Sequence, residues 1–520
     1  MPLPVLTVAQ MRAWEKATWA TGVRETEVIA RVGEAVARKI RERVPASGRV
    51  LLLAGRGNNG NDVRAALPHL VPVASASQFF GKADSVTCCP DLEVSFLEVT
   101  DPEEAQPELE RLLNAWPDWV VDGLFGIGLN RPLSPEWCQL IETVNASGLP
   151  VLAVDVPSGL DADSGTHFGA AIRAEVTLTV GAPKRGLVRE AAFEFVGRLE
   201  VAADVGLLAD PESAVGSQTG LRREDGWEFR QSWTTAADFA GFPPRRRVDS
   251  HKGSYGHLVI IAGSVGYHGA AVLAARAAGA ARSGLVTVIT SPGAYPVVAG
   301  QLAFAMVRPW SEPLGLPAKA SAVLIGPGLA GSDVPDWLKA QTLTWWRELP
   351  LPLIVDASAL DWLAVEHRAW WQGRGNGGLD AAAMMRGHHS WHHHVAPRII
   401  TPHPGEAARW FPEPVGDRFG AAEHLGRVAG IAVLKGHQTL VAGPAAPTYL
   451  NPTGNPGLAQ GGSGDVLAGF AGGLLAQPAL QADPLKTVRY AVWEHGAAAD
   501  RLEALGRNWT AEDLAAEIGR

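Results

Sequence analysis

From residue 49 onward, the chain repeats one order of segments: a short run of Val, Leu and Ile, a glycine-containing turn, and a stretch long enough for a helix. Residues 50–54 lead into the glycines of 55–60, and residues 151–155 lead into 156–159. Apolar runs of this length, separated by helices, are typical of a parallel sheet with helices on both faces. The sequence therefore predicts a three-layer α/β fold for this part of the chain.

The same order of segments resumes after a break. Residues 207–247 are rich in Asp, Glu, Ser, Gly and Pro, and strand-sized apolar runs begin again at 258–262. A chain of 520 residues is also too long for one hydrophobic core. We therefore expect a first α/β domain at residues 1–215, a linker at 216–247, and a second α/β domain at 248–520.

Composition excludes several classes of protein. No apolar run approaches the roughly 18 residues of a membrane span, and no secretory signal precedes the first domain. The formal net charge is −9 and the only basic cluster is at 245–247, so neither a nucleic acid nor a membrane is an expected partner. Cys88, Cys89 and Cys138 lack metal-ligand spacing, which favours a reducing, cytoplasmic location.

The first glycine-rich turn, Gly-Arg-Gly-Asn-Asn-Gly at residues 55–60, matches the G-x-G-x-x-G pattern that binds dinucleotides. Its backbone N–H groups could bind a phosphate at the start of the next helix. A dehydrogenase is disfavoured, because residues 71–80 lack the acidic residue that would bind a ribose. The alternative is a tight turn with no ligand.

Five polar residues fall at or just after predicted strand ends in the first domain: Asn59, Asp62, Asp122, Asp155 and Ser158. Ligands of open α/β sheets bind at this edge. Carboxylate, amide and hydroxyl oxygens gathered there could hold a hard cation, and one carboxylate could act as a general base. The alternative is that these residues cap helices, which explains one or two of them more easily than all five.

In the second domain, Gly-Gly-Ser-Gly-Asp at residues 461–465 precedes an apolar helix. A glycine-rich turn at a helix N-terminus can bind a phosphate, and Asp465 could take a proton from a hydroxyl that attacks it. Lys435 ends a strand and could reach a nucleotide phosphate. The alternatives are a structural loop and a surface lysine. The histidines within 388–394 are expected in a solvated insertion, with a metal site as the alternative.

Five motifs of the second half, taken together and in order, carry a resemblance to a known family. They are HKGSYGH at 251–257, GPG at 326–328, TPHPGE at 401–406, KGH at 435–437 and GGSGD at 461–465. With these motifs the chain resembles the bifunctional NAD(P)H-hydrate repair enzymes, an epimerase fused to an ADP-dependent dehydratase. The resemblance covers nearly the whole chain. It implies an N-terminal Rossmann-like three-layer domain and a C-terminal ribokinase-like α/β domain.

For the second domain, the resemblance implies dehydration of the S form of the hydrate with ADP or ATP and Mg²⁺. The C6 hydroxyl is phosphorylated, and loss of phosphate restores the nicotinamide ring. Asp465 matches the catalytic base. The residues that match nucleotide contacts are Lys435, Gly436, His437, Gln438, Thr439 and Gly464, and those that match hydrate contacts are Ala270, Gly328 and His403.

For the first domain, the resemblance implies interconversion of the R and S hydrates, with K⁺ bound by Asn59, Asp122 and Ser158 and with Asp155 as the candidate base. The matching hydrate-binding residues are Asn58, Asn59, Gly60, Asn61, Asp62, Gly126, Ile127, Gly128, Leu129, Asn130, Arg131 and Pro132. Asn61 and Val63 replace two glycines of the family motif. Their side chains would block a positive φ angle or the close approach of a pyrophosphate, which predicts an impaired epimerase.

The expected ligands are therefore NAD(P)H hydrates and an adenine nucleotide, and the expected assembly is a homo-oligomer. An alternative is a ribokinase-like kinase for a small alcohol, with an N-terminal domain that only binds ligand or mediates assembly. The two hypotheses differ in their products, because a repair enzyme releases free phosphate and NAD(P)H.

Overall fold

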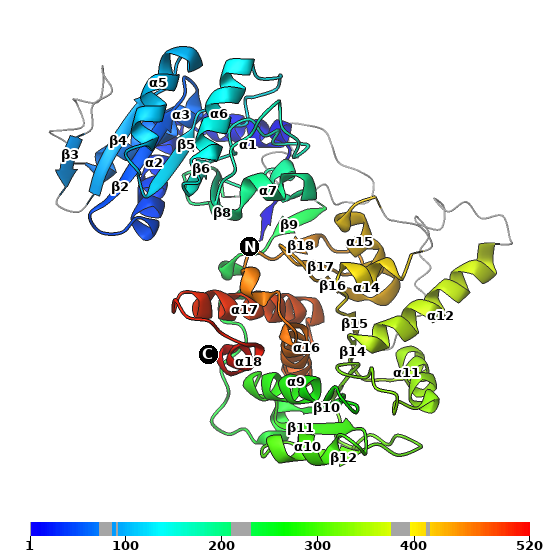
Figure 1. Ribbon diagram of the computed structural model, residues 1–520. Helices are drawn as coiled ribbons and strands as arrows, with labels where there is room; N and C mark the ends of the chain where they lie inside the picture. Colours follow the sequence, from blue (N-terminus) through cyan, green and yellow to red (C-terminus); the bar gives the residue numbers. More distant parts are fainter. Residues whose placement is uncertain (1, 72–85, 90–91, 210–229, 376–395, 412–415) are drawn as a thin grey trace. The chain divides into compact units, whose positions relative to one another are not determined.

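The computed structural model describes residues 2–71, 86–89, 92–209, 230–375, 396–411 and 416–520. The chain divides into two compact units, Leu3–Phe229 and a second unit that contains Arg230–Arg520 (Figure 1). The histidine-rich residues at 388–394 lie outside the described residues. No helix in the described part of the chain is both long enough and apolar enough to span a membrane.

The first unit is built on one sheet with the strand order β3-β4-β2-β5-β6-β7-β8 (Figure 1). All neighbouring pairs are parallel except β3 and β4. The strands are β2 (Gly48–Ala54), β3 (Val86–Cys89), β4 (Leu92–Glu98), β5 (Trp119–Gly123), β6 (Val151–Val154), β7 (Val176–Val180) and β8 (Arg198–Ala202).

Helices cover both faces of this sheet, and β2 shows why. Its alternate residues Val50 and Leu52 pack into one core with α2 and α3, while Leu51 and Leu53 pack into another core with α5 and α6. A strand buried on both faces must be apolar where it is buried, as β2 is from Val50 to Ala54; Arg49, near its start, is exposed. The predicted three-layer α/β fold is confirmed. The helices are α1 (Val8–Ala20), α2 (Glu25–Arg43), α3 (Asn58–Leu70), α5 (Pro102–Leu113), α6 (Pro135–Ala146) and α7 (Phe193–Val196).

The second unit contains a larger mixed sheet, in which the strands follow the order β9-β18-β17-β16-β15-β14-β13-β10-β11-β12. The strands from β15 to β12 are parallel, whereas β16–β17 and β17–β18 pair antiparallel. The strands are β9 (Gln231–Trp233), β10 (His257–Ile261), β11 (Leu285–Thr290), β12 (Met306–Pro309), β13 (Ala322–Ile325), β14 (Leu353–Val355), β15 (Arg398–Ile400), β16 (Ile431–Leu434), β17 (Leu440–Ala442) and β18 (Thr448–Leu450).

Two helices of the second unit, α9 (His268–Ala280) and α16 (Ser463–Leu475), pack unusually closely. A Cβ atom on Gly469 would lie 2.1 Å from the carbonyl oxygen of Ala274, so only glycine fits at this crossing. The small residues of both helices therefore set their separation. The remaining helices are α10 (Tyr295–Gln301), α11 (Asp336–Glu348), α12 (Ser358–Gly375), α14 (Pro404–Ala408), α15 (Arg418–Ala429), α17 (Pro484–Glu503) and α18 (Ala511–Glu517).

The described part of the expected linker, residues 230–247, belongs to the second unit. Within it, β9 pairs in parallel with β18, and Phe239 is buried. Asp238 accepts a hydrogen bond of 2.6 Å from Arg489, and both side chains are shielded from solvent. β9, Asp238 and Phe239 therefore pack within the second unit, whereas residues 244–247 are exposed.

Three histidines of the second unit make its stability depend on pH. Burial lowers the pKa values of His367, His424 and His495 to about 4. In the unfolded chain their pKa values are about 6.5, so below that pH the unfolded state binds more protons and stability falls until the pH reaches about 4. We expect each histidine to remove up to ~1.4 kcal/mol per pH unit in this window. Denaturant titrations of wild type and His424→Gln at neutral and mildly acidic pH measure this. Equal pH slopes for both proteins would contradict it.

Candidate functional sites

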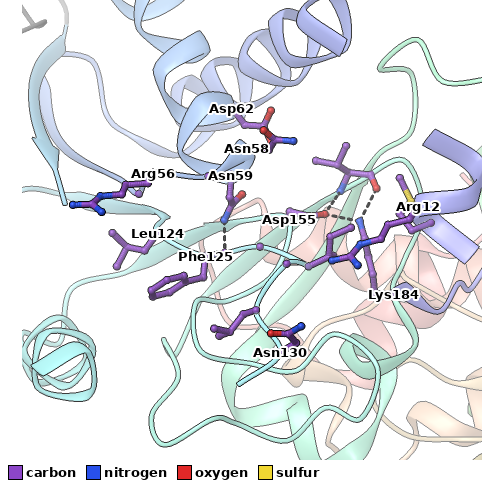
Figure 2. A pocket seen from close by; sticks show the side chains of 18 of the residues that line it. Arg12, Arg56, Asn58, Asn59, Asp62, Leu124, Phe125, Asn130, Asp155 and Lys184 are labelled. Atoms are coloured by element: carbon purple, nitrogen blue, oxygen red, sulfur yellow. Dashed lines mark hydrogen bonds and ion pairs between the residues drawn. The ribbon is translucent and has the colours of Figure 1, made fainter. Parts of the chain in front are cut away.

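A pocket of about 610 Å³ lies at the carboxyl edge of the first sheet (Figure 2). Its walls come from segments that directly follow β2, β4, β5, β6 and β7, with Arg12 and Glu15 of α1 on another side. Of the residues predicted to bind the hydrate, Gly60, Asn61 and Pro132 do not line the pocket. Those that do are Asn58, Asn59, Asp62, Gly126, Ile127, Gly128, Leu129, Asn130 and Arg131, and the predicted base Asp155 lines it too.

The two residues that replace family glycines are both accommodated in α3. Neither Asn61 nor Val63 has a positive φ angle. Asn61 accepts a hydrogen bond of 3.1 Å from Arg64, and Val63 is fully buried in the core. A Cβ on Gly123 would lie 2.3 Å from a Val63 methyl group, so the valine occupies space that glycine leaves at position 123. Neither position therefore requires a positive φ angle, and neither side chain lines the pocket.

Below the pocket, oxygen atoms gather around Asp122, Ser158 and Asn59, which are all buried. The Ser158 hydroxyl donates to Asp122 Oδ1 at 2.6 Å, and Asn59 Nδ2 donates to the Phe125 carbonyl at 2.7 Å. The Asn59 Oδ1 atom is buried and has no hydrogen-bond partner among the described residues. Burial raises the pKa of Asp122 to about 6, although hydrogen bonds from Ser158 and Leu124 oppose the shift.

None of the five polar residues singled out at strand ends caps a described helix. The α3 helix, for example, begins after Gly57, and α6 begins after Ser134. The capping alternative therefore fails within the described part of the chain. A polar cluster that neither caps a helix nor is fully hydrogen-bonded has the composition of a ligand site.

Asp155 sits directly after β6 with φ +64°, an uncommon conformation outside glycine. Its Oδ1 atom lies 2.5 Å from the ammonium group of Lys184, which is buried, and also accepts from the Val180 N–H at 3.1 Å. Asp62 faces the same pocket (Figure 2). Burial, followed by the charge of Asp155, raises the pKa of Asp62 well above its ordinary value. Lys184 was not found from the sequence, since nothing local indicates its partner.

In the second unit, Asp465 lies in the first turn of α16, which begins after Gly462 at φ +96°. Burial, then the Asp356 charge, raises the pKa of Asp465 to about 7, although Lys435 opposes the shift. A Cβ on Gly464 would lie 3.3 Å from Lys435 Nζ, so the predicted loop and lysine are neighbours. The structure thus brings together Lys435, Gly464 and Asp465 at the positive end of a helix dipole.

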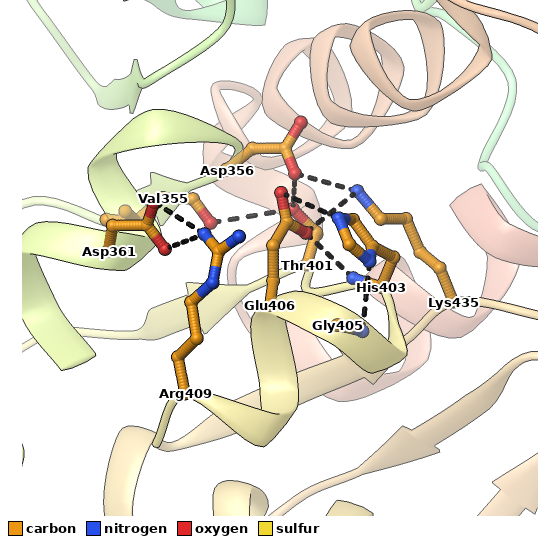
Figure 3. Close-up of polar contacts among 9 residues, drawn as sticks. All are labelled: Val355, Asp356, Asp361, Thr401, His403, Gly405, Glu406, Arg409 and Lys435. Atoms are coloured by element: carbon orange, nitrogen blue, oxygen red, sulfur yellow. Dashed lines mark hydrogen bonds and ion pairs between the residues drawn. The ribbon is translucent and has the colours of Figure 1, made fainter. Parts of the chain in front are cut away.

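Lys435 is held by carboxylates that the sequence did not single out (Figure 3). Its Nζ atom lies 3.0 Å from Asp356 Oδ1 and 3.9 Å from Glu406 Oε2. Asp356 also accepts from the Thr401 hydroxyl at 2.7 Å. Burial lowers the pKa of Lys435, but Asp356, Glu406 and Asp465 outweigh it and the net shift is upward. Lys435 is therefore charged. Asp356 directly follows an apolar strand, and this position at a strand end is the feature of the sequence that could have identified it.

The predicted hydrate contacts of the second unit occupy two places. A Cβ on Gly328 would lie 3.0 Å from the Ala270 Cβ, so these two residues are adjacent. His403 is half exposed, and its ring accepts from Gly405 N at 3.1 Å, with Glu406 Oε1 at 3.5 Å from Nε2 (Figure 3). Through Glu406, His403 is linked to Lys435.

The predicted nucleotide-binding turn, Lys435 to Thr439, departs sharply from strand geometry. Gly436 has φ +142° and Gln438 has φ +50°, and the Thr439 hydroxyl donates to the Gly436 carbonyl at 3.0 Å. His437 is exposed. The Gln438 Oε1 atom is buried without a hydrogen-bond partner in the part of the chain that is described. The turn therefore presents an unused acceptor at the sheet edge.

A family model described as NAD(P)H-hydrate dehydratase matches residues 258–520, and one described as the N-terminus of YjeF-related proteins matches residues 25–186. The bifunctional NAD(P)H-hydrate repair enzyme of Coxiella burnetii is 34% identical over 527 residues, covering 97% of this chain and 96% of that protein. This chain belongs to the bifunctional NAD(P)H-hydrate repair enzyme family. The resemblance noted from the motifs is confirmed.

Other NAD(P)H-hydrate repair enzymes align over the same length. The Escherichia coli enzyme is 32% identical over 535 residues, which cover 98% of this chain and 92% of that protein. Among solved structures, an ADP/ATP-dependent NAD(P)H-hydrate dehydratase from Bacillus subtilis, co-crystallised with ATP and Mg²⁺, is 30% identical with a TM-score of 0.43, covering 53% of this chain and 91% of that one. The two matched family models fall one in each unit of this repair-enzyme family member.

Proposed function

We propose that the chain repairs hydrated NAD(P)H by two reactions, one in each unit. The second unit dehydrates the S hydrate with ADP or ATP, and the first unit interconverts the R and S hydrates. The observation that carries the proposal is the Asp465 carboxyl, with its pKa raised to about 7, at the start of α16 beside Lys435. Full-length similarity to repair enzymes supports both reactions.

In the second unit, Asp465 takes the proton of the C6 hydroxyl as that oxygen attacks the terminal phosphorus of the nucleotide. The Lys435 ammonium and the N–H groups at the start of α16 stabilise the negative charge that develops on the phosphoryl oxygens. Loss of phosphate from C6 and of a proton from C5 then restores the ring. The products are NAD(P)H, inorganic phosphate and AMP or ADP.

The residues that we propose to bind the two substrates of this unit lie at the same edge of its sheet. Lys435, Gly436, His437, Gln438, Thr439 and Gly464 would bind the nucleotide, and Ala270, Gly328 and His403 the hydrate. The buried, unused Gln438 Oε1 atom supports the first assignment, because it can accept a hydrogen bond from a nucleotide N–H group. The adjacency of Gly328 and Ala270 supports the second.

A Mg²⁺ ion fits this site. Glu406 and Asp465 both lie close enough to Lys435 to raise its pKa, and their carboxylate oxygens are ligands that Mg²⁺ prefers. These two residues would hold the ion together with the nucleotide phosphates. When bound, Mg²⁺ neutralises charge on the phosphates.

In the first unit, Asp155 takes the proton of the C6 hydroxyl. The C6–N1 bond breaks, its electron pair stays on N1, and the C6–O bond becomes a carbonyl. Rotation about C5–C6 lets N1 attack the opposite face of C6, and Asp155 returns the proton to the oxygen. No other reactant is needed. The pocket residues Asn58, Asn59, Asp62, and Gly126 to Arg131 would orient the hydrate.

A K⁺ ion fits the buried oxygen cluster beneath the pocket. The unpartnered Asn59 Oδ1 atom, the Ser158 hydroxyl and the Asp122 carboxylate supply oxygen ligands with one negative charge. Asn59, Asp122 and Ser158 would hold the ion, whose charge compensates the buried carboxylate. Because Asn61 and Val63 leave the pocket open, we propose an active epimerase.

Purified protein mixed with R and S hydrates, Mg²⁺ and ADP or ATP tests the proposal through the near-ultraviolet absorbance of the reduced nicotinamide ring. We expect both hydrates to be recovered, with release of free phosphate, and recovery of the R form to be faster in K⁺ than in Li⁺. Recovery of only the S form would contradict epimerisation. No recovery with either nucleotide would contradict the repair function and favour a small-molecule kinase. The expected homo-oligomer stays a prediction.

A further inference from the structure

The pocket of the first unit contains three acidic side chains, Glu15, Asp62 and Asp155, and a single buried cation, Lys184. That cation is directed at only one of them. The Lys184 side chain is 1% exposed, and its ammonium group donates to Asp155 Oδ1 at 2.5 Å, Thr179 Oγ1 at 3.0 Å and the Val180 carbonyl at 2.7 Å. All three of its N–H donors are therefore used.

Because all three N–H donors of Lys184 are used within the protein, Lys184 cannot donate a hydrogen bond to a ligand. Any effect of Lys184 on the reaction must therefore act through Asp155. The ammonium group and the Val180 N–H bind Asp155 Oδ1, while a Cβ on Gly126 would lie 3.5 Å from Asp155 Oδ2. Gly126 lines the pocket, so Oδ2 is the oxygen that faces bound ligand. Asp155 Oδ1 is therefore fixed by hydrogen bonds, and Asp155 Oδ2 faces the pocket.

We propose that Lys184 is the positioning residue of the epimerase: it anchors Asp155 Oδ1 so that Oδ2 is aimed at the C6 hydroxyl of the hydrate. This inference rests on the proposed epimerase function. It also explains why Asp155 is the base among three acids, because it is the one with a neighbouring cation at hydrogen-bond distance. Within the described part of the chain, no cation lies at hydrogen-bond distance from Asp62 or Glu15, and burial raises the pKa of both carboxyls.

The positive φ angle of Asp155 gives the contact a second function. A non-glycine residue at φ +64° is strained unless its surroundings hold it. Three hydrogen bonds to Oδ1, from the Lys184 ammonium, the Val180 N–H and the Thr179 hydroxyl, supply that restraint together with the backbone hydrogen bond from Asp155 N to the Leu178 carbonyl at 2.8 Å. Without the ammonium group, the carboxylate loses its strongest anchor and can rotate away from the hydrate.

The test is Lys184→Met in the full chain, with R hydrate as substrate. We expect kcat for epimerisation to fall by roughly 10²-fold, the scale of a misplaced catalytic group, while KM changes much less. Lys184→Arg should recover part of kcat. Dehydration of S hydrate by the same protein should be unchanged.

Lys16→Met is the matched control, since Lys16 is an exposed lysine of the same unit that does not line the pocket. Thr179→Val removes one acceptor of Lys184 and the 3.4 Å hydrogen bond from the Thr179 hydroxyl to Asp155 Oδ1, while the ammonium charge stays, and we expect about a fivefold loss of kcat. This second variant decides the question should Lys184→Met fold poorly. A purely structural role predicts lower stability but unchanged kcat in the folded protein, and that result overturns the proposal. If wild type itself shows no epimerisation, the proposed function fails instead.

Discussion

We expect replacement of Asp465 by asparagine to abolish recovery of NAD(P)H from the S hydrate, with kcat lowered by about 10³-fold. The amide has nearly the same shape as the carboxyl, so the first turn of α16 is retained, but it cannot accept a proton. Binding of nucleotide and hydrate, followed by calorimetry, should change little, because the loss falls on the chemical step. Epimerisation in the first unit serves as an internal check that the chain is folded.

The same carboxyl makes the wild-type reaction dependent on pH. The pKa of Asp465 is raised to about 7, and only the ionised form can act as a base. Below that pH, kcat/KM should therefore fall about tenfold per pH unit, and above it the profile should level off. Asp336→Asn is the matched control, since Asp336 is exposed on another helix of the same unit. Substantial dehydratase activity in Asp465→Asn would exclude Asp465 as the base.

We expect replacement of Arg398 by methionine to destabilise the second unit by about 3–5 kcal/mol, because several buried carbonyls would each lose a donor at a cost of about 1–3 kcal/mol. Arg398 is 1% exposed, and no carboxylate among the described residues pairs with it. Its guanidinium group instead donates to backbone carbonyls at and beyond the C-terminus of α11, with 2.7 Å to Trp346 and 2.6 Å to Leu349. Burial lowers the pKa of Arg398 to about 10, so the group stays charged. Methionine would leave these carbonyls without donors.

Amide hydrogen exchange in α11 and β15, read by mass spectrometry, measures this loss in the full chain. Arg409→Met is the control: Arg409 forms an exposed ion pair with Asp361 at 2.5 Å, and removing it should change stability by less than about 1 kcal/mol. Similar protection losses in the two variants would show that the carbonyl contacts of Arg398 contribute no more than a surface ion pair.

The order of segments was sufficient to predict two α/β units, because β2 and its counterparts are apolar on both faces and each precedes a glycine turn. Strand order and direction were less accessible. The antiparallel β17 and β18 are three residues each, and β9 lies in a stretch whose composition is that of a linker. Its strand character depends on pairing with β18, which is far away in sequence.

Residues at strand ends were found because their position indicates function, whereas their partners were not. Asp155 and Lys435 were singled out, but Lys184 and Asp356 depend on contacts across 29 and 79 residues. Val63 illustrates a related failure. The sequence showed only that a valine stands where the resemblance leads one to expect glycine. In the structure, the Val63 side chain fills the space that the absent side chain of Gly123 leaves. Reading each position separately could not reveal that these two residues compensate each other.

Both units belong to one polypeptide, and this has a consequence for metabolism. Each time the gene is translated, one epimerase site and one dehydratase site are made together, so their copy numbers are equal at every expression level. Transcription of this gene therefore changes both activities in the same proportion. A shift in the ratio of the two activities of this chain has to come from the turnover rates of the two sites or from the supply of adenine nucleotide.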